Sequence, residues 1–553
     1  MAARLVNNPS LGNYWKLVKS DRVVQNIGMT REHRKNFLLS SIKMAIATLS
    51  SRVLGFAREI LMAKLFGASG LTDAYQIAFR IPNMLRDLFA EGSFSSAFVP
   101  IFTSAKKDGD EHARKLLWSM AIVLLVITSI VCLLIFIFAP QIIQILTNEL
   151  FTSDVNRLEM SVLLTRMMSP FLAFVSVAAL FMGVLNTYKM FFAPAMAPAV
   201  FNIIMIVSMI TLPKFLEARN LHPIVSLGVG VLIGGFLQML IQVPMLFSKG
   251  LVKLDGIELF SSDVKEILKR MSIGTIGVAA TQINLLVSTF LATGTVVGAV
   301  SWLQYAFRLF QFPVGILGVS IGNSNLVYFS ELWRGGKEEE AKGALQTSYI
   351  TSLFVLMPAM ALMFALAQDC VAISFQRGAF GLDDTKMVTE ALYAYLFGLP
   401  FYGLYKVFSP SFYTLDKPKI PVIISSIAVG INIIFCFSLV DTYGFKILAM
   451  GTSISMIFII LVQSILLFKL LDLKLKFFFP LRFFKIGLSS LLAFYATQYV
   501  RGYFPNNIFS TLDNLAAFVV AACAGAFAYV IALSVLGDYV LIQRFLNKII
   551  RRN

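Results

Sequence analysis

Nine basic side chains lie inside long apolar stretches of this 553-residue chain, where a charge is costly. They are Lys43, Arg52, Arg58, Lys64, Arg80, Arg86, Arg166, Arg308 and Lys406. An arginine stays protonated in proteins, and placing one at the centre of a bilayer costs at least about 2.5–3.5 kcal/mol. Each arginine must therefore face water, a counter-charge or an anionic ligand. The forked donors of a guanidinium suit phosphate and diphosphate in particular.

Two explanations compete for these nine residues. A basic residue near the end of a span can extend its head group to the membrane interface, which suits the lysines of the set and Arg166. This explanation suits Arg52 and Arg58 less well, because both lie well inside an apolar segment that runs from about residue 38 to 66. We therefore expect these two guanidiniums to face the interior of the protein.

Acidic residues near the arginines neutralise only part of their charge. Glu59 and Asp87 each follow an arginine, and Asp73 and Glu91 flank the second apolar segment. Basic residues still outnumber acids in these two segments. The surplus favours an anionic ligand held in a wet, positively charged cavity, with structural ion pairs as the alternative.

The composition excludes several other functions. The chain has 47 Lys and Arg against 30 Asp and Glu, but in so apolar a chain the net charge of +17 indicates cytoplasmic loops rather than nucleic-acid binding. The four cysteines lack paired spacing, and the three histidines fall in polar segments, so neither a zinc site nor a disulfide framework is expected. No phosphate-binding G-x-x-x-x-G-K-[ST] loop is present. We expect no cofactor and no enzymatic activity.

The apolar stretches predict an all-α polytopic membrane protein, since 58% of the residues are hydrophobic and only 14% are charged. A helix needs about 20 apolar residues to cross a bilayer. Fourteen spans are predicted, beginning near residues 38, 74, 117, 160, 194, 223, 271, 297, 347, 387, 419, 447, 481 and 513. An even count places both termini on one side, and the positions of Lys and Arg predict that this side is cytoplasmic. Residues 1–37 have no apolar start and are predicted to be a basic cytoplasmic segment, like the tail at 541–553.

An internal repeat divides the spans. Gln76-Ile-Ala-Phe-Arg80 recurs as Gln304-Tyr-Ala-Phe-Arg308, and Thr187 and Pro194 recur as Thr414 and Pro421 at nearly the same offset. A duplicated unit of six helices predicts two lobes around a central cavity, related by an axis along the membrane normal. The predicted lobes cover 38–250 and 251–470, and the last two helices, within 471–540, pack on the flank of one lobe.

Several motifs together resemble one protein family. The first are Ser51-Arg-Val-Leu-Gly-Phe-Ala-Arg-Glu59, Thr72-Asp-Ala-Tyr75, Pro82-Asn-Met-Leu-Arg86 and Phe89-Ala-Glu-Gly-Ser-Phe-Ser-Ser-Ala-Phe-Val-Pro100. A further set lies in the eighth span, in Ser301-Trp302, Tyr305-Ala306, Arg308-Leu309, Phe312-Pro313 and Gly315-Ile-Leu-Gly-Val319. These residues resemble the bacterial lipid II flippases of the MurJ (MviN) family. The match is dense over about fifty residues and thinner from about 38 to 540.

The resemblance implies a fourteen-helix member of the multidrug/oligosaccharidyl-lipid/polysaccharide exporter superfamily, with a fold like that of the MATE transporters. Such a protein flips lipid II, an undecaprenyl-diphosphate-linked muropeptide, to the outer leaflet of the bacterial inner membrane by alternating access. The resemblance places Arg52, Arg58, Arg86 and Arg308 in the cavity and makes Asp73 an important acid near the outer end. It also implies that the last two helices hold the polyprenyl tail. Our candidate set for substrate binding adds Arg80 and Glu91.

The sequence departs from the family in the eighth span, where relatives commonly read Ala-Asp-Arg-Leu-Met-Glu-Phe-Pro. Here Phe307 and Gln311 replace the two acids, so Arg308 lacks these neighbours and the resemblance does not carry ion coupling over to this chain. We expect Arg52, Arg58 and Arg308 to clamp the diphosphate. Membrane potential or a monovalent cation is expected to reset the empty carrier.

Other functions remain as alternatives. A related flippase for lipid-linked polysaccharide, or a MATE-type antiporter, would share the fold, although an antiporter needs a cavity acid. A membrane glycosyltransferase would need an acidic metal motif, and Asp383-Asp384 is the one such pair. A scaffold for cell-wall machinery would tolerate loss of the cavity charges. The expected partners are lipid II, membrane lipids and other cell-wall synthesis proteins, and no nucleic acid.

Overall fold

The computed structural model describes residues 31–89, 93–504, 511–539 and 543. Within these residues the secondary structure is helical and contains no strand, as expected for an all-α membrane protein. The predicted terminal segments 1–37 and 541–553 lie almost entirely outside the described residues. The first helix begins at Arg31, several residues before the predicted start of the first span.

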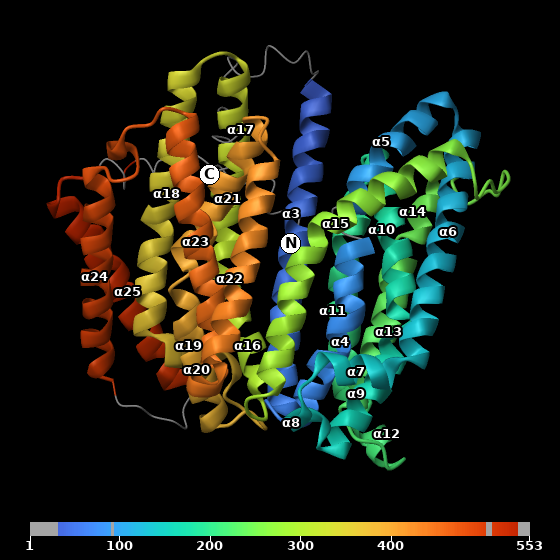
Figure 1. Ribbon diagram of the computed structural model, residues 1–553, viewed down its shortest axis with the longest axis horizontal. Coiled ribbons are helices and arrows are strands. Elements are labelled where there is room, and N and C mark those ends of the chain that lie inside the picture. Colours follow the sequence, from blue (N-terminus) through green and yellow to red (C-terminus); the bar gives the residue numbers. More distant parts are fainter. Residues whose placement is uncertain (1–30, 90–92, 505–510, 540–542, 544–553) are drawn as a thin grey trace.

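The helices of the first half of the chain form one bundle, on the right of Figure 1. They are α3 (Arg31–Phe66), α4 (Gly70–Phe89), α5 (Ser93–Asp108), α6 (Asp110–Ile137), α7 (Ala139–Leu146), α8 (Glu149–Thr152), α9 (Val155–Met168), α10 (Phe171–Thr187), α11 (Phe192–Thr211), α12 (Pro213–Glu217), α13 (Val225–Leu240) and α14 (Val243–Ser248). Helix α3 stands at the inner edge of this bundle, where it packs along α11.

The helices of the second half form the other bundle, on the left of Figure 1, with α15 running between the two. They are α15 (Ser262–Thr293), α16 (Ala299–Pro313), the π-helix η2 (Val314–Gly318), α17 (Val319–Arg334), α18 (Glu338–Ala365), α19 (Ala367–Phe375), α20 (Leu382–Leu396), α21 (Leu399–Thr414), α22 (Lys419–Tyr443), α23 (Lys446–Leu470), the short η3 (Leu475–Phe477), α24 (Leu481–Gly502) and α25 (Thr511–Val535). Helices α24 and α25 pack on each other and on α18, at the outer flank.

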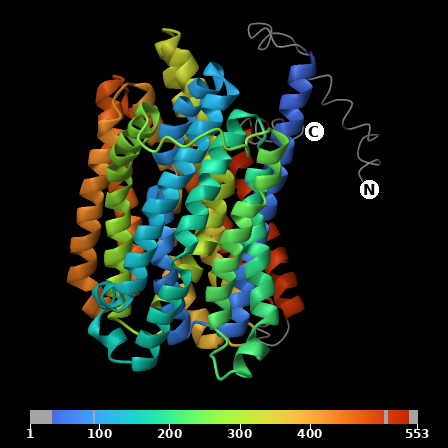
Figure 2. The same ribbon diagram turned by 90° about the vertical axis from the view of Figure 1, so that its right-hand side faces the viewer.

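The long helices run roughly parallel in both views, as expected of a membrane bundle (Figure 2). We call the end where α3 begins the basic end, and the end with the α3–α4 turn the far end. Among the described residues, nine helices are long and apolar enough to cross a membrane. The predicted count of fourteen spans, and the lobe boundaries at 250 and 470, stay predictions.

The sequence repeat is visible in the backbone. Helices α6 and α18 each have 28 residues and begin 228 positions apart, at Asp110 and Glu338. The same turn follows both α10 and α21: Lys189 and Asp416 have φ of 59° and 56°. In these turns the N–H of Met190 donates to Leu185 and the N–H of Lys417 donates to Phe412, each at 2.9 Å. Helices of equal length 228 positions apart and equal turns 227 positions apart indicate a duplicated unit.

The far end of the molecule is closed by a core that both bundles share. Met62 and Tyr75 from the first bundle pack in one buried cluster with Tyr305, Phe375 and Phe380 from the second. The Tyr305 ring is fully buried and lies 4.9 Å from the Phe375 ring and 5.5 Å from the Phe380 ring. Burying rings of this size supplies much of the packing energy at a contact. The two bundles are therefore joined firmly at the far end.

Candidate functional site

The two bundles enclose one cavity of about 900 Å³ near the middle of the molecule. Helices α3, α4, α10 and α11 line it from one side, and α15, α16, α21 and α22 line it from the other. Four arginines reach this surface: Arg58, Arg80, Arg86 and Arg308. The sequence predicted all four, and the structure brings them from three helices to one space.

Glu59 lies between two of these arginines. Its Oε1 is 2.6 Å from Nη2 of Arg58, the preceding residue on α3, and 3.5 Å from Nε of Arg308 on α16. The Glu59 side chain is only 5% exposed, and no hydrogen-bond partner of its Oε2 is found among the described residues. Because a buried carboxylate needs positive partners, Glu59 attracts both guanidiniums and links the two bundles across the cavity.

Arg58 is held from a second direction by α11. Its Nη1 donates to the side-chain carbonyl of Asn202 at 3.1 Å, and the amide nitrogen of Asn202 donates to the backbone carbonyl of Ser51 at 3.1 Å. The guanidinium also lies 5.8 Å from the centre of the Phe201 ring. These contacts fix the direction of the Arg58 side chain without neutralising its charge.

The remaining cavity arginines lie on α4, six residues apart. Arg86 pairs with Asp87, with 2.9 Å between Nη2 and Oδ1. No carboxylate lies within ion-pair distance of Arg80 in the described part of the chain. The lining therefore holds four arginines and two carboxylates, which gives a formal surplus of two positive charges (4 − 2). A confined surplus of this kind attracts anions.

Arg52 does not reach the cavity surface in this conformation. It lies nearer the basic end of α3, and its Nη1 donates to the backbone carbonyl of Gly315 at 3.1 Å. Gly315 belongs to η2, the single π-helical turn between α16 and α17. Turns of this type shift the backbone hydrogen-bonding pattern and are frequent at functional sites. Arg52 thus makes a second link between the bundles.

Asp73 also lies away from the cavity, at the far end, where it caps α16. Its carboxylate accepts hydrogen bonds from the N–H of Gly298 at 2.7 Å, the N–H of Ser301 at 2.8 Å and the hydroxyl of Ser301 at 2.6 Å. Gly298 has a φ of 94°, a conformation that favours glycine and lets its N–H face the acid. A carboxylate at a helix N-terminus satisfies free N–H groups and complements the helix dipole. Asp73 therefore ties α4 of one bundle to α16 of the other.

Comparisons with known proteins assign this architecture. The family model "Lipid II flippase MurJ" matches residues 62–524. The chain belongs to the MurJ family. A relative in Buchnera aphidicola subsp. Schizaphis graminum, named as a probable lipid II flippase MurJ, is 32% identical over 507 residues, covering 91% of this chain and 97% of its own length. A second, the lipid II flippase MurJ of Burkholderia cenocepacia, is 36% identical over 392 residues, covering 70% of this chain and 74% of its own length.

Solved structures agree with this assignment. A MurJ lipid II flippase in an inward closed conformation superposes with a TM-score of 0.76 at 28% identity, over 90% of this chain and all of that protein. An inward-facing MATE multidrug transporter superposes with a TM-score of 0.62 at 14% identity, over 77% of this chain and 98% of its own length, and shows a shared fold. The predicted family and the MATE-like fold are thereby confirmed.

The candidate residues of this MurJ-family chain separate into three groups. Arg58, Arg80, Arg86 and Arg308 line the cavity, while Arg52 and Asp73 tie the bundles together outside it. The third group is Glu91, which lies outside the described residues. Within the described residues, no cluster of three metal-binding side chains is found.

Sequence reasoning missed several polar residues of the cavity. Glu59 was noted only as a neutralising neighbour of Arg58, although it contacts arginines of both bundles. The amides of Asn284 and Asn432, on α15 and α22, were not considered, yet they line the cavity and Asn432 donates to Asn284 at 2.7 Å. Their position inside apolar helices was the signal that could have identified them, since polar side chains in membrane helices usually face the bundle interior.

Proposed function

We propose that this chain flips lipid II from the cytoplasmic to the outer leaflet by alternating access, for cell-wall synthesis. This is transport rather than enzymatic conversion. Relatives across its length are named as lipid II flippases, and the cavity has the charge that an anionic head group requires. The proposal rests above all on the surplus of arginines, contributed by both bundles to one shared space.

The diphosphate of the substrate is the ligand that suits this surplus. Arg80 is the arginine for which no carboxylate partner was found, so it is free to form charge-assisted hydrogen bonds with phosphate oxygens. Arg58 and Arg308 already meet at Glu59, and a diphosphate near them would add negative charge where two guanidiniums converge. Arg52 would join the clamp only after leaving the Gly315 carbonyl.

The polyprenyl tail would remain in the lipid beside α24 and α25. One ion pair ties these helices to the rest of the second bundle, and another joins the start of α24 to the segment after α25. Arg501 binds Asp369 of α19 through Nε and Nη2, both at 2.9 Å, and Arg482 binds Asp538 at 3.0 Å. A fixed pair of helices at the flank suits a surface for the tail better than a moving gate.

The basic end would face the cytoplasm, with both termini there, in the bacterial inner membrane. This orientation follows from the distribution of Lys and Arg among the loops. Membrane potential would help to reset the empty carrier, because moving one charge through 100 mV is worth about 2.3 kcal/mol. A monovalent cation and partner proteins of cell-wall synthesis belong to the same proposal.

The test is lipid II flipping by proteoliposomes that contain Arg80→Gln. Loss of one or two charge-assisted hydrogen bonds, each worth about 1.5–3 kcal/mol, should lower the rate at least tenfold. The matched control is Arg166→Gln, because Arg166 is also an arginine within an apolar helix but binds the Phe136 carbonyl and does not line the cavity. The control should flip lipid II at nearly the normal rate. Equal rates for both variants and the unaltered protein would rule out the diphosphate clamp.

The nearest alternative is a flippase for another lipid-linked saccharide, since the diphosphate chemistry is shared. Flipping of lipid II and of an undecaprenyl-diphosphate polysaccharide precursor by the same proteoliposomes separates the two. A MATE-type antiporter is less consistent with the cavity, where arginines outnumber carboxylates.

A further inference from the structure

The segment Leu251–Ser261 joins the two bundles at the basic end, and we call it the linker. It connects α14 of the first bundle to α15, which begins at Ser262. In Figures 1 and 2 the linker runs across the outer face of the first bundle, transverse to the helices and short of the tips of α5 and α6. A segment with this course lies parallel to the membrane plane.

One edge of the linker is fixed to α6 by polar contacts. The indole of Trp118 donates to the Leu251 carbonyl at 2.9 Å, and the N–H of Glu258 donates to the Ser119 hydroxyl at 2.8 Å. Asp255 forms an ion pair with Arg114. Three contacts over eight residues hold the linker in a defined position against the bundle.

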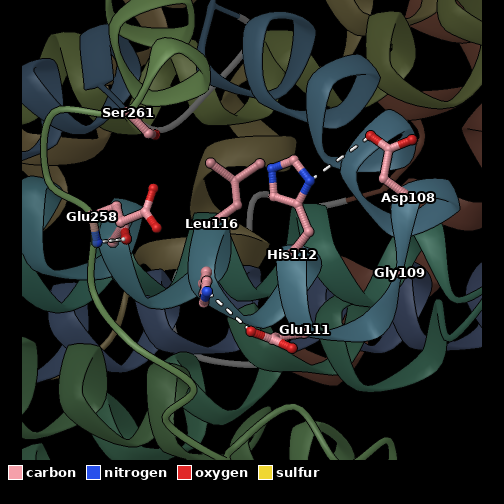
Figure 3. Close-up of a pocket in the computed structure, with 9 residues that line it drawn as sticks. Asp108, Gly109, Glu111, His112, Leu116, Glu258 and Ser261 are labelled. Carbon is pink, nitrogen blue, oxygen red and sulfur yellow. Dashed lines mark hydrogen bonds and ion pairs between the residues drawn. The ribbon is translucent and has the colours of Figure 1, made fainter.

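A polar pocket of about 360 Å³ lies along this inner edge (Figure 3). Asp108, His112 and Lys115 line it from the first bundle, and Glu258 and Ser261 line it from the linker. A space lined with charges of both signs is suited to water. The inner edge of the linker is therefore polar along this pocket, while Leu251 at its start is buried in the apolar core of the first bundle.

The other edge of the linker is apolar and exposed. Leu254 is 65% exposed, Ile257 47% and Phe260 80%. These residues follow one another at intervals of three, while Asp255 and Glu258 between them engage the bundle. Nothing in the described residues covers this apolar edge.

Basic residues flank the apolar edge. Lys249 and Lys253 lie at its start, and Lys265 and Lys269 follow on the first turns of α15, all four exposed. Among the described residues, no carboxylate lies within ion-pair distance of Lys249, Lys265 or Lys269. Apolar side chains flanked by lysines are the composition of segments that bind anionic membrane surfaces.

We propose that the linker is an interfacial anchor, in which Leu254, Ile257 and Phe260 enter the leaflet at the basic end and the lysines bind anionic phospholipid head groups. A lipid surface fits better than a protein partner, because the linker lies parallel to the membrane plane and carries the complementary charge. The anchor fixes the height at which α15 starts, and α15 is the helix that leads from one bundle to the other. This inference does not depend on the transported substrate.

The test uses the full chain, in which Cys523, the exposed native cysteine, is first replaced. An environment-sensitive fluorophore is then attached to the new cysteine of the variant Phe260→Cys. The control label is at Lys337→Cys, in the α17–α18 turn, also at the basic end. Each protein is placed, one copy per nanodisc, in phosphatidylcholine alone or with added phosphatidylglycerol. The label at 260 should show blue-shifted emission and protection from a water-soluble quencher, more so with phosphatidylglycerol, while the label at 337 stays accessible. Equal accessibility of both labels in both lipids would overturn the anchor.

Two further measurements complete the test. The first separates the contribution of the lysines from that of the apolar residues, and the second separates lipid from a second copy of this chain as the occupant of the apolar edge. Lys249→Gln/Lys265→Gln/Lys269→Gln should abolish the effect of phosphatidylglycerol on the label at 260; an unchanged effect would overturn the role of the lysines. Protection that appears only when detergent-solubilised chains self-associate, and not in nanodiscs, would assign the apolar edge to a second copy and refute lipid insertion.

Discussion

At the scale of single residues, the central feature is a carboxylate shared by guanidiniums from two bundles. Glu59 contacts Arg58 and Arg308, so it acts as an internal counter-ion where a phosphorylated head group would otherwise bind. Binding of a diphosphate is then a competition between two sources of negative charge. This competition allows release as well as capture, because the empty site is already partly neutralised.

Glu59→Gln should therefore bind the head group more tightly but flip it more slowly. The change raises the formal surplus of the cavity lining from two to three positive charges and removes the counter-ion that favours release. We expect several-fold tighter binding of lipid II in detergent and a flipping rate at least fivefold lower in proteoliposomes. Asp87→Asn serves as the control, because it raises the surplus by the same one charge, whereas Asp87 contacts only Arg86 of its own helix among the ion pairs described. A smaller effect of this variant would assign the difference to the contact of Glu59 with arginines of both bundles. Weaker binding by Glu59→Gln would contradict the counter-ion role.

The arginines were predictable from sequence because a charge in an apolar segment is conspicuous. Glu59 was not recognised as central, because its second partner, Arg308, lies 249 positions away and only folding brings the two together. Asp73 was singled out, but its role as a helix cap depends on Gly298 and Ser301 of the other bundle. Sequence identifies groups that are costly to bury, whereas their partners depend on packing between distant segments.

At the scale of elements, the helices that carry the cavity arginines are less apolar than other helices of the cavity lining. Helices α3, α4 and α16, which carry all the candidate arginines, are absent from the nine helices of the described residues that are apolar enough to cross a membrane. On these helices Arg58, Arg80, Arg86 and Arg308 face the cavity rather than lipid. The predicted α3–α4 connection, from residue 66 to 73, is shorter in the structure, where α4 begins at Gly70. Helix positions were thus predictable from apolar length, while helix ends depended on local turns.

The π-helix η2 provides a prediction about Arg52. A Cβ added at Gly315 would lie 3.0 Å from Nη1 of Arg52, so Gly315→Ala should displace the guanidinium from the carbonyl. We expect a two- to fivefold change in flipping rate and a larger distance between spin labels on α3 and α17. Gly318→Ala is the matched control in the same turn, because its nearest neighbour, Cα of Gly403, lies at an ordinary 3.5 Å. Similar behaviour of the two variants would exclude a role for the Arg52 contact.

At the scale of the whole molecule, few polar contacts hold the bundles together at the far end. Asp73 caps α16, the Tyr305 hydroxyl donates to the Gly67 carbonyl at 3.3 Å, and the N–H of Ala379 donates to the Lys64 carbonyl at 2.9 Å. Hydrogen bonds of this kind contribute about 1 kcal/mol each, and those to a charged group about 1.5–3 kcal/mol. Two conformations that interconvert differ by only a few kcal/mol, so opening the far end requires other contacts to replace these hydrogen bonds. The far end is therefore closed by two kinds of contact, the buried aromatic core and a small set of hydrogen bonds.

Asp73→Asn should shift the molecule toward a conformation open at the far end. The amide keeps the shape of the carboxylate and one acceptor oxygen, which can still accept from Ser301, but it loses the negative charge. Its NH2 group replaces the oxygen that accepts from the N–H of Gly298, so that hydrogen bond is lost. A loss of about 1.5–3 kcal/mol changes the ratio of the two conformations by at least tenfold. Spin labels at Glu149→Cys and Lys386→Cys, both exposed at the far end on different bundles, report the change as a longer distance. Ser301→Ala removes one of the three hydrogen bonds and should produce a smaller shift. Equal distances in both variants and in the unaltered chain would contradict the prediction. They would show that the shared aromatic core alone keeps the far end closed.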